Sequence, residues 1–377
     1  MDPDDTVKAV ESILKQLDLK HNLLKNSVGL LFCYVDFLTS GMVKELSSRL
    51  PFEVVGCTSL GFSVPGAAEE IMFILMVLTS DDVEFSTGIS EPLAQNAEER
   101  IAELYRRTAG ERTAKPALVF TFPPLIHNLS GNTVVDVLDR VSGGSPIIGG
   151  VAEDAGVAIR SPQTIYNGSA YPDRLPLLLI FGDVKVRFLL DFLPGEMIFN
   201  QQAVITKAEG NRLISLDNMP AAAFMEKIGL IRKGMIDVLY AFPISVDYHD
   251  GLEPRVFTIY NVNDDGSLTS GSSIPPGGTL RIGSVTSDLV MESAVHITEL
   301  IKKGAAREGV LIFSCFSRSL ACEDPNAELK LVNKQLESFP APYIFLYVSG
   351  EICPVYTEQK DLINRFHQYT IVVCVLG

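Results

Sequence analysis

The chain has 377 residues, with 31 Lys and Arg against 46 Asp and Glu, and its formal net charge is −15. Apolar residues make up 47% and charged residues only 20%, so the chain is too apolar to be disordered and can bury a large core. The acidic balance argues against a nucleic-acid partner, because phosphate binding needs clustered Lys and Arg, and the sequence has no such run.

Neither a membrane span nor a secretion signal is predicted. The longest apolar run, residues 71–78, is far shorter than the ~20 residues that cross a bilayer. The chain begins MDPDD, whereas a signal peptide has a basic start and an apolar stretch. The six cysteines form no C-x-x-C pair, which favours free thiols in a reducing compartment. We therefore expect a cytoplasmic protein.

The predicted elements begin with an amphipathic helix over residues 4–19, whose apolar side chains fall on one stripe. A pattern then occurs three times: an apolar strand, a helix, a proline-led strand that ends near a glycine, a loop and a further strand. The first copy has its elements at residues 28–34, 41–49, 51–56 and 71–78. A long helix at 91–108 joins the first copy to the second.

The second copy has its elements at 117–122, 132–141, 146–149 and 177–181, and the third at 309–315, 326–338, 342–348 and 369–376. A strand, a crossover helix and a second strand predict a parallel pair. Because the strands are nearly continuous apolar runs, both of their faces should be covered. The alternative is that the three copies resemble one another by chance, since small units of this kind recur in many folds.

A different segment lies between the second and third copies. Its strands are predicted at 184–191, 203–208, 212–216, 238–243, 255–262 and 279–284, and its helices at 220–228 and 288–303. We expect a domain boundary near residue 183, which gives two domains, 1–183 and 184–377. The expected fold class is α/β of the mixed α+β kind, with mixed sheets covered by helices.

Two glycines and an acid follow the second strand of the second copy. Gly149 and Gly150 end this strand, and Asp154 comes four residues later. Open α/β sheets bind ligands at the carboxyl ends of their strands, so this loop is a candidate for close approach to a ligand. The alternative is a structural glycine turn with Asp154 as its cap. Neither a G-x-G-x-x-G motif nor a P-loop occurs, so nucleotide binding has no support.

A second candidate group ends the first strand of the third copy. Cys315 closes a very apolar strand, and Arg318 follows three residues later. An arginine can bind a ligand carboxylate or phosphate through two parallel hydrogen bonds. The alternative is that Arg318 pairs with Glu351. Cys315 is more typical of a small packed residue than of a nucleophile.

Two further candidates lie close to the carboxyl end of the chain. Glu351 comes just after a buried strand, so its charge needs a partner. His367 precedes the last strand, where it is either a ligand contact or a structural histidine with satisfied hydrogen bonds.

Four short segments in this order resemble the FIST family, which pairs a FIST-N with a FIST-C domain. They are residues 148–154 (IGGVAED), 314–318 (SCFSR), 349–354 (SGEICP) and 366–370 (FHQYT). The resemblance covers the chain from about residue 25 to its end. It implies a sensory or ligand-binding module that detects small molecules, amino acids among them, and acts with a histidine kinase, a cyclase or a chemoreceptor. Some members of the family bind haem and sense nitric oxide.

The leading hypothesis is a sensor, not an enzyme, that binds a small polar ligand and signals through a separate partner. Arg318 would bind an anionic group, Glu351 or Asp154 an amine, and glycine amides would line the floor. The site would thus combine residues from both halves of the chain, namely Gly149, Gly150, Asp154, Cys315, Arg318, Glu351 and His367.

Three alternatives belong to other functional classes. The first is a haem-based gas sensor, for which His127, His249, His296 and His367 are the candidate axial ligands. The second is an enzyme with Cys315 as nucleophile, His367 as base and Glu351 as orienting group. The third is a protein-interaction scaffold without a ligand.

Overall fold

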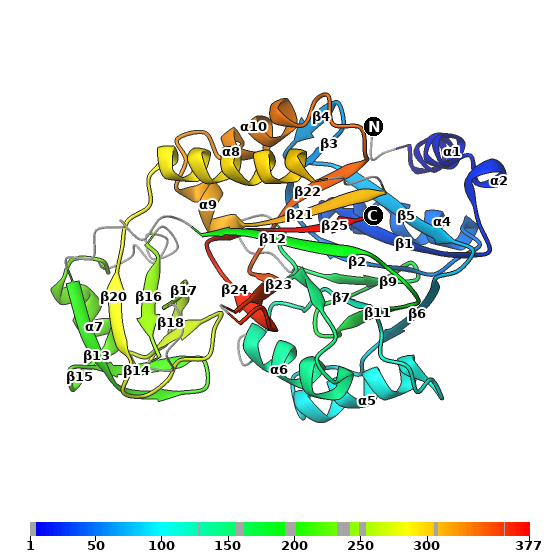
Figure 1. Cartoon of the computed structure of the whole chain (residues 1–377). Coiled ribbons are helices and arrows are strands. Elements are labelled where there is room, and N and C mark those ends of the chain that lie inside the picture. The colour runs from blue at the N-terminus through cyan, green and yellow to red at the C-terminus, as the bar shows by residue number, and fades with distance from the viewer. Residues whose placement is uncertain are drawn as a thin grey trace.

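The computed structural model describes residues 5–126, 129–154, 162–192, 201–231, 242–248, 254–304, 308–357 and 359–377. The fold is mixed α+β, as predicted, and Figure 1 shows its sheets and covering helices. No helix in these ranges is long and apolar enough to cross a membrane. Residues 238–241 of a predicted strand lie outside the described residues, as do His127 and His249.

The first of the three predicted copies contains a parallel strand pair. Its elements are α1 (Thr6–Leu17), α2 (Leu19–Asn22), β1 (Asn26–Cys33), α3 (Asp36–Thr39), α4 (Met42–Arg49), β2 (Val54–Thr58), β3 (Leu60–Val64), β4 (Ala67–Glu69), β5 (Phe73–Ser80) and β6 (Glu84–Ile89). Strands β1 and β2 are parallel, and β5 pairs antiparallel with the other side of β1.

The second and third copies have the same pairing. The second contains α5 (Ala97–Ala109), β7 (Leu118–Thr121), α6 (Gly131–Ser142), β8 (Ile147–Gly150), β9 (Thr164–Tyr166), β10 (Ser169–Tyr171), β11 (Pro176–Phe181) and β12 (Val186–Phe192). The third contains α8 (Ser287–Lys303), β21 (Gly309–Cys315), α9 (Phe316–Leu320), α10 (Ala327–Gln335), β22 (Tyr343–Val348), β23 (Glu351–Tyr356), β24 (Leu362–His367) and β25 (Thr370–Leu376). The parallel pairs are β7–β8 and β21–β22, so the predicted parallel pairing is confirmed in all three copies.

Each copy also contributes a hairpin to the sheet of another copy. Strand β3, which follows β2, pairs with β22 in the third copy. Strand β9, which follows β8, pairs with β2 in the first, and β23, which follows β22, pairs with β8 in the second. The resulting sheets have the orders β10-β9-β2-β1-β5, β24-β23-β8-β7-β11-β6 and β4-β3-β22-β21-β25-β12, which we call the first, second and third sheets.

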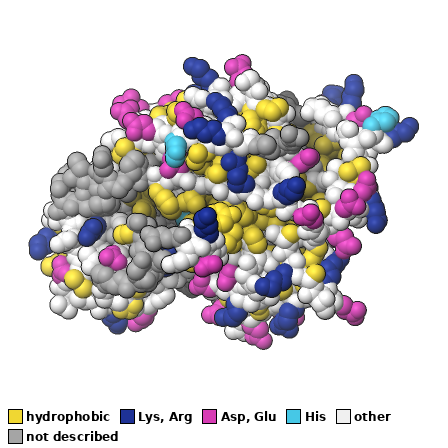
Figure 2. Space-filling model, in the orientation of Figure 1, with side chains coloured by type: hydrophobic (Ala, Val, Ile, Leu, Met, Phe, Trp, Pro, Cys, Tyr) yellow, Lys and Arg dark blue, Asp and Glu magenta, His cyan; other side chains and the backbone are white. Residues whose placement is uncertain are grey.

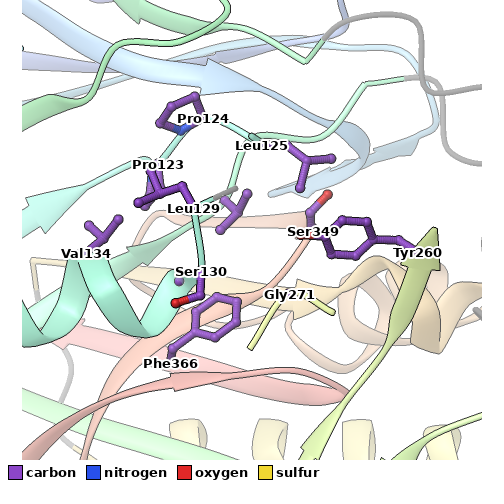
Figure 3. Close-up of a pocket in the computed structure, with 12 residues that line it drawn as sticks. Pro123, Pro124, Leu125, Leu129, Ser130, Val134, Tyr260, Gly271, Ser349 and Phe366 are labelled. Carbon is purple, nitrogen blue, oxygen red and sulfur yellow. The ribbon is translucent and has the colours of Figure 1, made fainter. Parts of the chain in front are cut away.

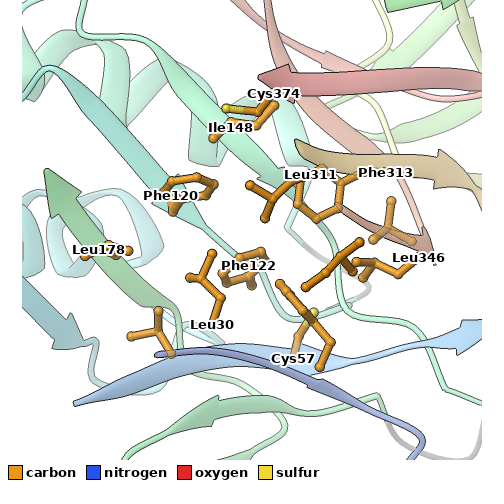
Figure 4. Close-up of a cluster of buried hydrophobic side chains, with 14 of the residues drawn as sticks. Leu30, Cys57, Phe120, Phe122, Ile148, Leu178, Leu311, Phe313, Leu346 and Cys374 are labelled. Carbon is orange, nitrogen blue, oxygen red and sulfur yellow. The ribbon is translucent and has the colours of Figure 1, made fainter. Parts of the chain in front are cut away.

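The inner faces of the three sheets share one hydrophobic core, shown in Figure 4. At its centre the Phe32 and Phe122 rings lie 5.1 Å apart, and the Phe313 ring lies 6.3 Å from each of them. One ring comes from, or directly follows, the first strand of each copy. Because each buried aromatic side chain contributes roughly 1.5–3 kcal/mol, this core joins the copies into one body.

Helices cover the outer face of each sheet. The first sheet is covered by α1 and α4, the second by α5 and α6, and the third by α8 and α10. Asp5 caps α1, since its side chain accepts a hydrogen bond from the amide of Lys8. The helix predicted over residues 91–108 begins later, at Ala97, because Asn96 has a left-handed backbone conformation that ends the helix on its amino-terminal side.

An antiparallel sheet with its own core is inserted between the second and third copies, at the left of Figure 1. Its elements are β13 (Gln201–Glu209), β14 (Arg212–Leu216), β15 (Met219–Pro220), α7 (Ala221–Lys227), β16 (Ile244–Asp247), β17 (Arg255–Phe257), β18 (Ile259–Val262), β19 (Leu268–Ser270) and β20 (Thr279–Ile282). We call residues 201–282 the insertion. Strands from both sides of residue 183 share sheets, and the domain boundary expected there stays a prediction.

Two glycines allow the parallel strands to approach closely. A Cβ atom on Gly149 would lie 1.8 Å from the carbonyl oxygen of Thr121, and one on Gly56 would lie 1.7 Å from that of Leu31. Both glycines face the first strand of their own copy in the parallel register. Close packing within the sheet therefore explains the glycine that ends the proline-led strand of each of these two copies.

We predict that Gly149→Ala destabilises the fold, because the new methyl group overlaps backbone atoms that cannot move without separating β7 from β8. The expected loss in the free energy of unfolding is about 1–3 kcal/mol, measured by urea denaturation. Gly309→Ala is the control, since its Cβ would meet no atom closer than 3.8 Å. Equal stability of the two variants would contradict the prediction.

Candidate functional site

A small hollow lies where the second copy, the third copy and the insertion meet (Figure 3). Its walls are the loop after β7, the start of α6, part of β18, the residue after β19 and two segments of the third copy. The lining residues are Pro123, Pro124, Leu125, Leu129, Ser130, Gly131, Val134, Val151, Tyr260, Gly271, Ser349 and Phe366. Its volume is about 10 Å³, which is room for about one water molecule.

Polar contacts join the insertion to the start of α6 beside this hollow. The amide of Gly131 donates to the carbonyl of Gly271 at 3.1 Å, and the amide of Ser273 donates to Asn132 Oδ1 at 2.9 Å. The hydroxyls of Ser130 and Ser273 lie 2.9 Å apart. Ser130 also caps α6 by accepting from the amide of Thr133. These contacts fix the position of the insertion beside the helix.

Four of the predicted site residues lie on three adjacent strands of the second sheet. Gly150 is opposite Glu351, and Glu351 is opposite His367. Gly149 is next to Gly150 on β8, opposite Ile352. The immediate chain neighbours of these residues, namely Val151 and Phe366, line the hollow, as does Ser349 two residues before Glu351. The predicted residues on these strands therefore lie next to part of the wall, and none of them lines the hollow.

Glu351 is fully buried with only part of its hydrogen-bonding capacity used. The hydroxyl and amide of Thr370 donate to Oε2, while no described residue donates a hydrogen bond to Oε1. Burial raises the pKa of Glu351 to about 8, although the hydrogen bonds from Thr370 and the positive charge of Arg318 act against this rise. The side chain is therefore a neutral acid over much of the range below pH 8.

Cys315 is the thiol neighbour of Glu351. Burial, together with the negative charge of Glu351, raises the pKa of Cys315 well above its usual range. A thiol in this environment stays protonated, and the thiolate is the nucleophilic form. All six cysteines are buried and free.

His367 is held by the protein backbone. Its Nε2 donates to the carbonyl of Cys353 at 3.0 Å, and its ring lies 5.9 Å from that of Phe192. Burial lowers the pKa of His367 to about 4, so the ring is neutral near pH 7. The enzyme alternative requires His367 to act as the base for the thiol of Cys315. In the structure Glu351 is the neighbour of Cys315, and the ring of His367 is hydrogen-bonded to the carbonyl of Cys353.

Arg318 forms a buried ion pair with Glu328, not with Glu351. Its Nη2 and Nε donate to Oε1 of Glu328 at 2.7 and 3.0 Å, and both side chains are completely buried. The hydroxyl of Ser314 donates to the other oxygen of Glu328 at 2.9 Å. The guanidinium also contacts Ser293 and the carbonyls of Val290 and Tyr369. Arg318 is therefore used within the protein, where it joins α8, α9 and α10.

Asp154 lies at the other end of this polar region. It is fully buried, and its amide donates to the carboxylate of the preceding residue, Glu153, at 2.9 Å. The same carboxylate accepts from Ser349 at 2.6 Å, two residues before Glu351. Through these contacts, and through Tyr369 and Thr370, the seven predicted residues belong to one continuous buried region. None of the seven lines the hollow.

None of the twelve lining residues is among the predicted site residues, and Ser130, Tyr260 and Gly271 also lie outside the segments that the prediction rested on. Ser130 could have been found, since a serine before a helix is a common amino-terminal cap. Tyr260 and Gly271 belong to the insertion, and only tertiary packing brings them to the second and third copies. Figure 3 shows the Tyr260 side chain extending from β18 toward Ser349.

The described residues contain no group of three or more His, Cys, Asp or Glu side chains that could hold a metal ion. His296 is exposed on α8, and its Nδ1 lies 3.1 Å from Oδ2 of Asp191. His367 is hydrogen-bonded to the carbonyl of Cys353. Figure 2 shows Lys and Arg interspersed with Asp and Glu on the visible face, without a basic stripe. The haem alternative stays a prediction.

We predict that Glu351→Gln reduces the dependence of stability on pH between 6.5 and 8. The folded pKa of Glu351, about 8, lies above the ordinary value of 4.5, so its stabilising contribution is complete below pH 4.5 and is lost as the pH rises to 8. His367 acts in the opposite sense, since its folded pKa lies below 6.5 and its contribution is lost as the pH falls toward 4.

Urea denaturation at several pH values between 6.5 and 8 isolates the Glu351 effect from that of His367. The free energy of unfolding of the wild type should fall with rising pH, while that of Glu351→Gln should change less. Parallel curves for the two proteins would show that the carboxyl group does not titrate as described.

We predict that Arg318→Met strongly destabilises the protein, because it leaves the carboxylate of Glu328 buried without its partner. The expected cost is about 3–5 kcal/mol in the free energy of unfolding. The control is Lys330→Met, which removes an exposed ion pair with Asp324 at 2.9 Å and should cost far less, because solvent screens exposed charges. A small cost for both substitutions would refute the structural role of Arg318.

Comparison with known protein families agrees with this architecture. A family model described as the FIST N domain matches residues 27–219, and one described as the FIST C domain matches residues 215–354. No curated protein matches the sequence significantly. FIST domains are sensory domains of signal-transduction proteins that signal to other proteins, and they are not catalytic. The chain matches the two models over most of its length, and it belongs to the FIST family.

Proposed function

We propose that the protein is a sensor whose small polar ligand, an amino acid or similar metabolite, binds between the insertion and the start of α6. The observation that carries this proposal is the hollow of Figure 3, which three parts of the chain form together. Its wall is continuous with the three strands that hold Gly149, Gly150, Glu351 and His367.

The chemistry of the wall suits a ligand with both polar and apolar parts. The start of α6 carries the positive end of a helix dipole and the hydroxyl of Ser130, which favour an anionic group. Val134, Leu125 and Phe366 supply apolar surface. Arg318 pairs with Glu328, so in this proposal α6, and not Arg318, binds the anion.

In this proposal four buried residues support the wall without contacting the ligand: Glu351, Cys315, His367 and Asp154. They position the strands whose neighbouring residues contact the ligand, and the neutral form of Glu351 allows the region to be buried without an unpaired charge.

The small size of the hollow suggests how ligand binding would change the structure. Because it holds only about one water molecule, a ligand must separate Gly271 from Gly131 and so move the insertion relative to the three sheets. A ligand that binds the separated arrangement more tightly shifts the equilibrium toward it. A separate partner, such as a histidine kinase or a cyclase, would detect this change.

We predict that at least one compound in a panel of amino acids and small metabolites raises the melting temperature of the protein, because a ligand that binds the folded state stabilises it. Tyr260→Phe removes one buried hydroxyl from the wall and should weaken binding of that compound about tenfold. Tyr356→Phe is the control, since Tyr356 is exposed on β23 and lies outside the hollow.

Haem forms a separate arm of this experiment. A Soret band that persists after removal of free haem would support the gas-sensor alternative and contradict an amino-acid ligand. A folded protein that no compound stabilises would contradict ligand sensing at this hollow.

A further inference from the structure

The three sheets have equivalent strand positions, and one of these positions in the first sheet is not occupied by any described strand. The third strand of each copy is β5, β11 or β25, and each pairs antiparallel with the first strand of its own copy. On its outer side, β11 is covered by β6 and β25 is covered by β12, both antiparallel. Strand β5 ends the first sheet, and no described residue pairs with its outer edge.

Burial of the third strands follows this difference. Every residue of β11 and of β25 is buried. In β5 only Ile74 is buried, and the other seven residues are partly exposed. Met76 and Leu78 contact the common core from this strand while remaining partly open to solvent. The first sheet thus lacks the cover that the other two sheets have.

The sequence of β5 also lacks the residues that usually prevent an edge strand from pairing with another chain. Its eight residues, FILMVLTS, include no charged residue and no proline. Edge strands that avoid pairing usually carry charges, prolines or bulges. The strands at the corresponding edges of the other sheets do carry charges, with Glu84 in β6 and Arg187 and Asp191 in β12.

We propose that the free edge of β5 binds an extended segment of a partner protein, which adds to the first sheet as an antiparallel strand. The main chain supplies hydrogen bonds in this mode of recognition, and alternate side chains supply specificity. The strands β6 and β12 define the segment that fits: six or seven residues, with apolar side chains facing the common core. In β12 these are Val186, Phe188 and Leu190.

One strand suits this place better than a second copy of the whole protein. At the equivalent edge of the second sheet, β6 lies against the neighbouring first sheet, and Asn26 donates a hydrogen bond to the carbonyl of Val83 at 3.0 Å. In both of the other sheets this place holds a single strand, and the sheet ends there. This inference does not depend on the proposed ligand.

The test uses the full chain and a labelled synthetic peptide with the sequence of residues 184–192, VKVRFLLDF, which forms β12 at the equivalent place. A scrambled peptide of the same composition is the control. Fluorescence anisotropy measures binding, and hydrogen exchange measures protection of the alternate β5 amides that face away from β1. We expect binding of the β12 peptide alone, with new protection in β5.

Two N-methylated forms of the peptide identify main-chain pairing. One is methylated at odd positions and the other at even positions. Only alternate amides of an added strand point toward β5, so one form should lose at least about tenfold in affinity and the other should lose about twofold or less.

Three results would overturn the proposal. The first is no binding, or an equal loss for both methylated forms. The second is full protection of the β5 amides in the free protein, which would show that the chain itself covers the edge. The third is protection that appears only as protein concentration rises, which would assign the edge to a second copy.

Discussion

The structure depends on the need to cover apolar strands that have almost no polar face. Strands β1, β7 and β21 are nearly continuous hydrophobic runs, and water must be excluded from both of their faces. Helices cover one face of each sheet, and the other two sheets cover the second face through the shared core. The exchange of hairpins then adds strands at one side of each sheet, so that no copy is complete without its neighbours.

This arrangement explains why polar groups of the candidate site are buried where the sheets meet. A charge in such a place is costly unless it is paired or neutralised. Arg318 and Glu328 satisfy this condition by pairing with each other, and Glu351 and His367 satisfy it by remaining neutral near pH 7. The residue types that sequence reasoning associates with chemistry therefore have a structural use here as well.

The insertion adds a second level of organisation to the three-sheet body. It has its own core and contacts the body through a few polar groups near Gly131, Ser273 and Gln368. A hollow at such a boundary suits the proposed sensor, because a ligand bound there would link its occupancy to the relative position of the two parts. The same body presents one uncovered strand edge, β5, on a different sheet.

The sequence by itself determined the class of fold, the three parallel strand pairs and most helices. These features follow from local apolar periodicity, capping and glycine placement. Only the tertiary structure decided that Arg318 pairs with Glu328, that hairpins pass between copies, and that Tyr260 and Ser349 line the same hollow. Neighbouring residues of a strand point to opposite faces, so the wall contains Phe366 while His367 faces the other side. Contacts of this kind join residues far apart in the chain, and their partners are set by packing of whole sheets.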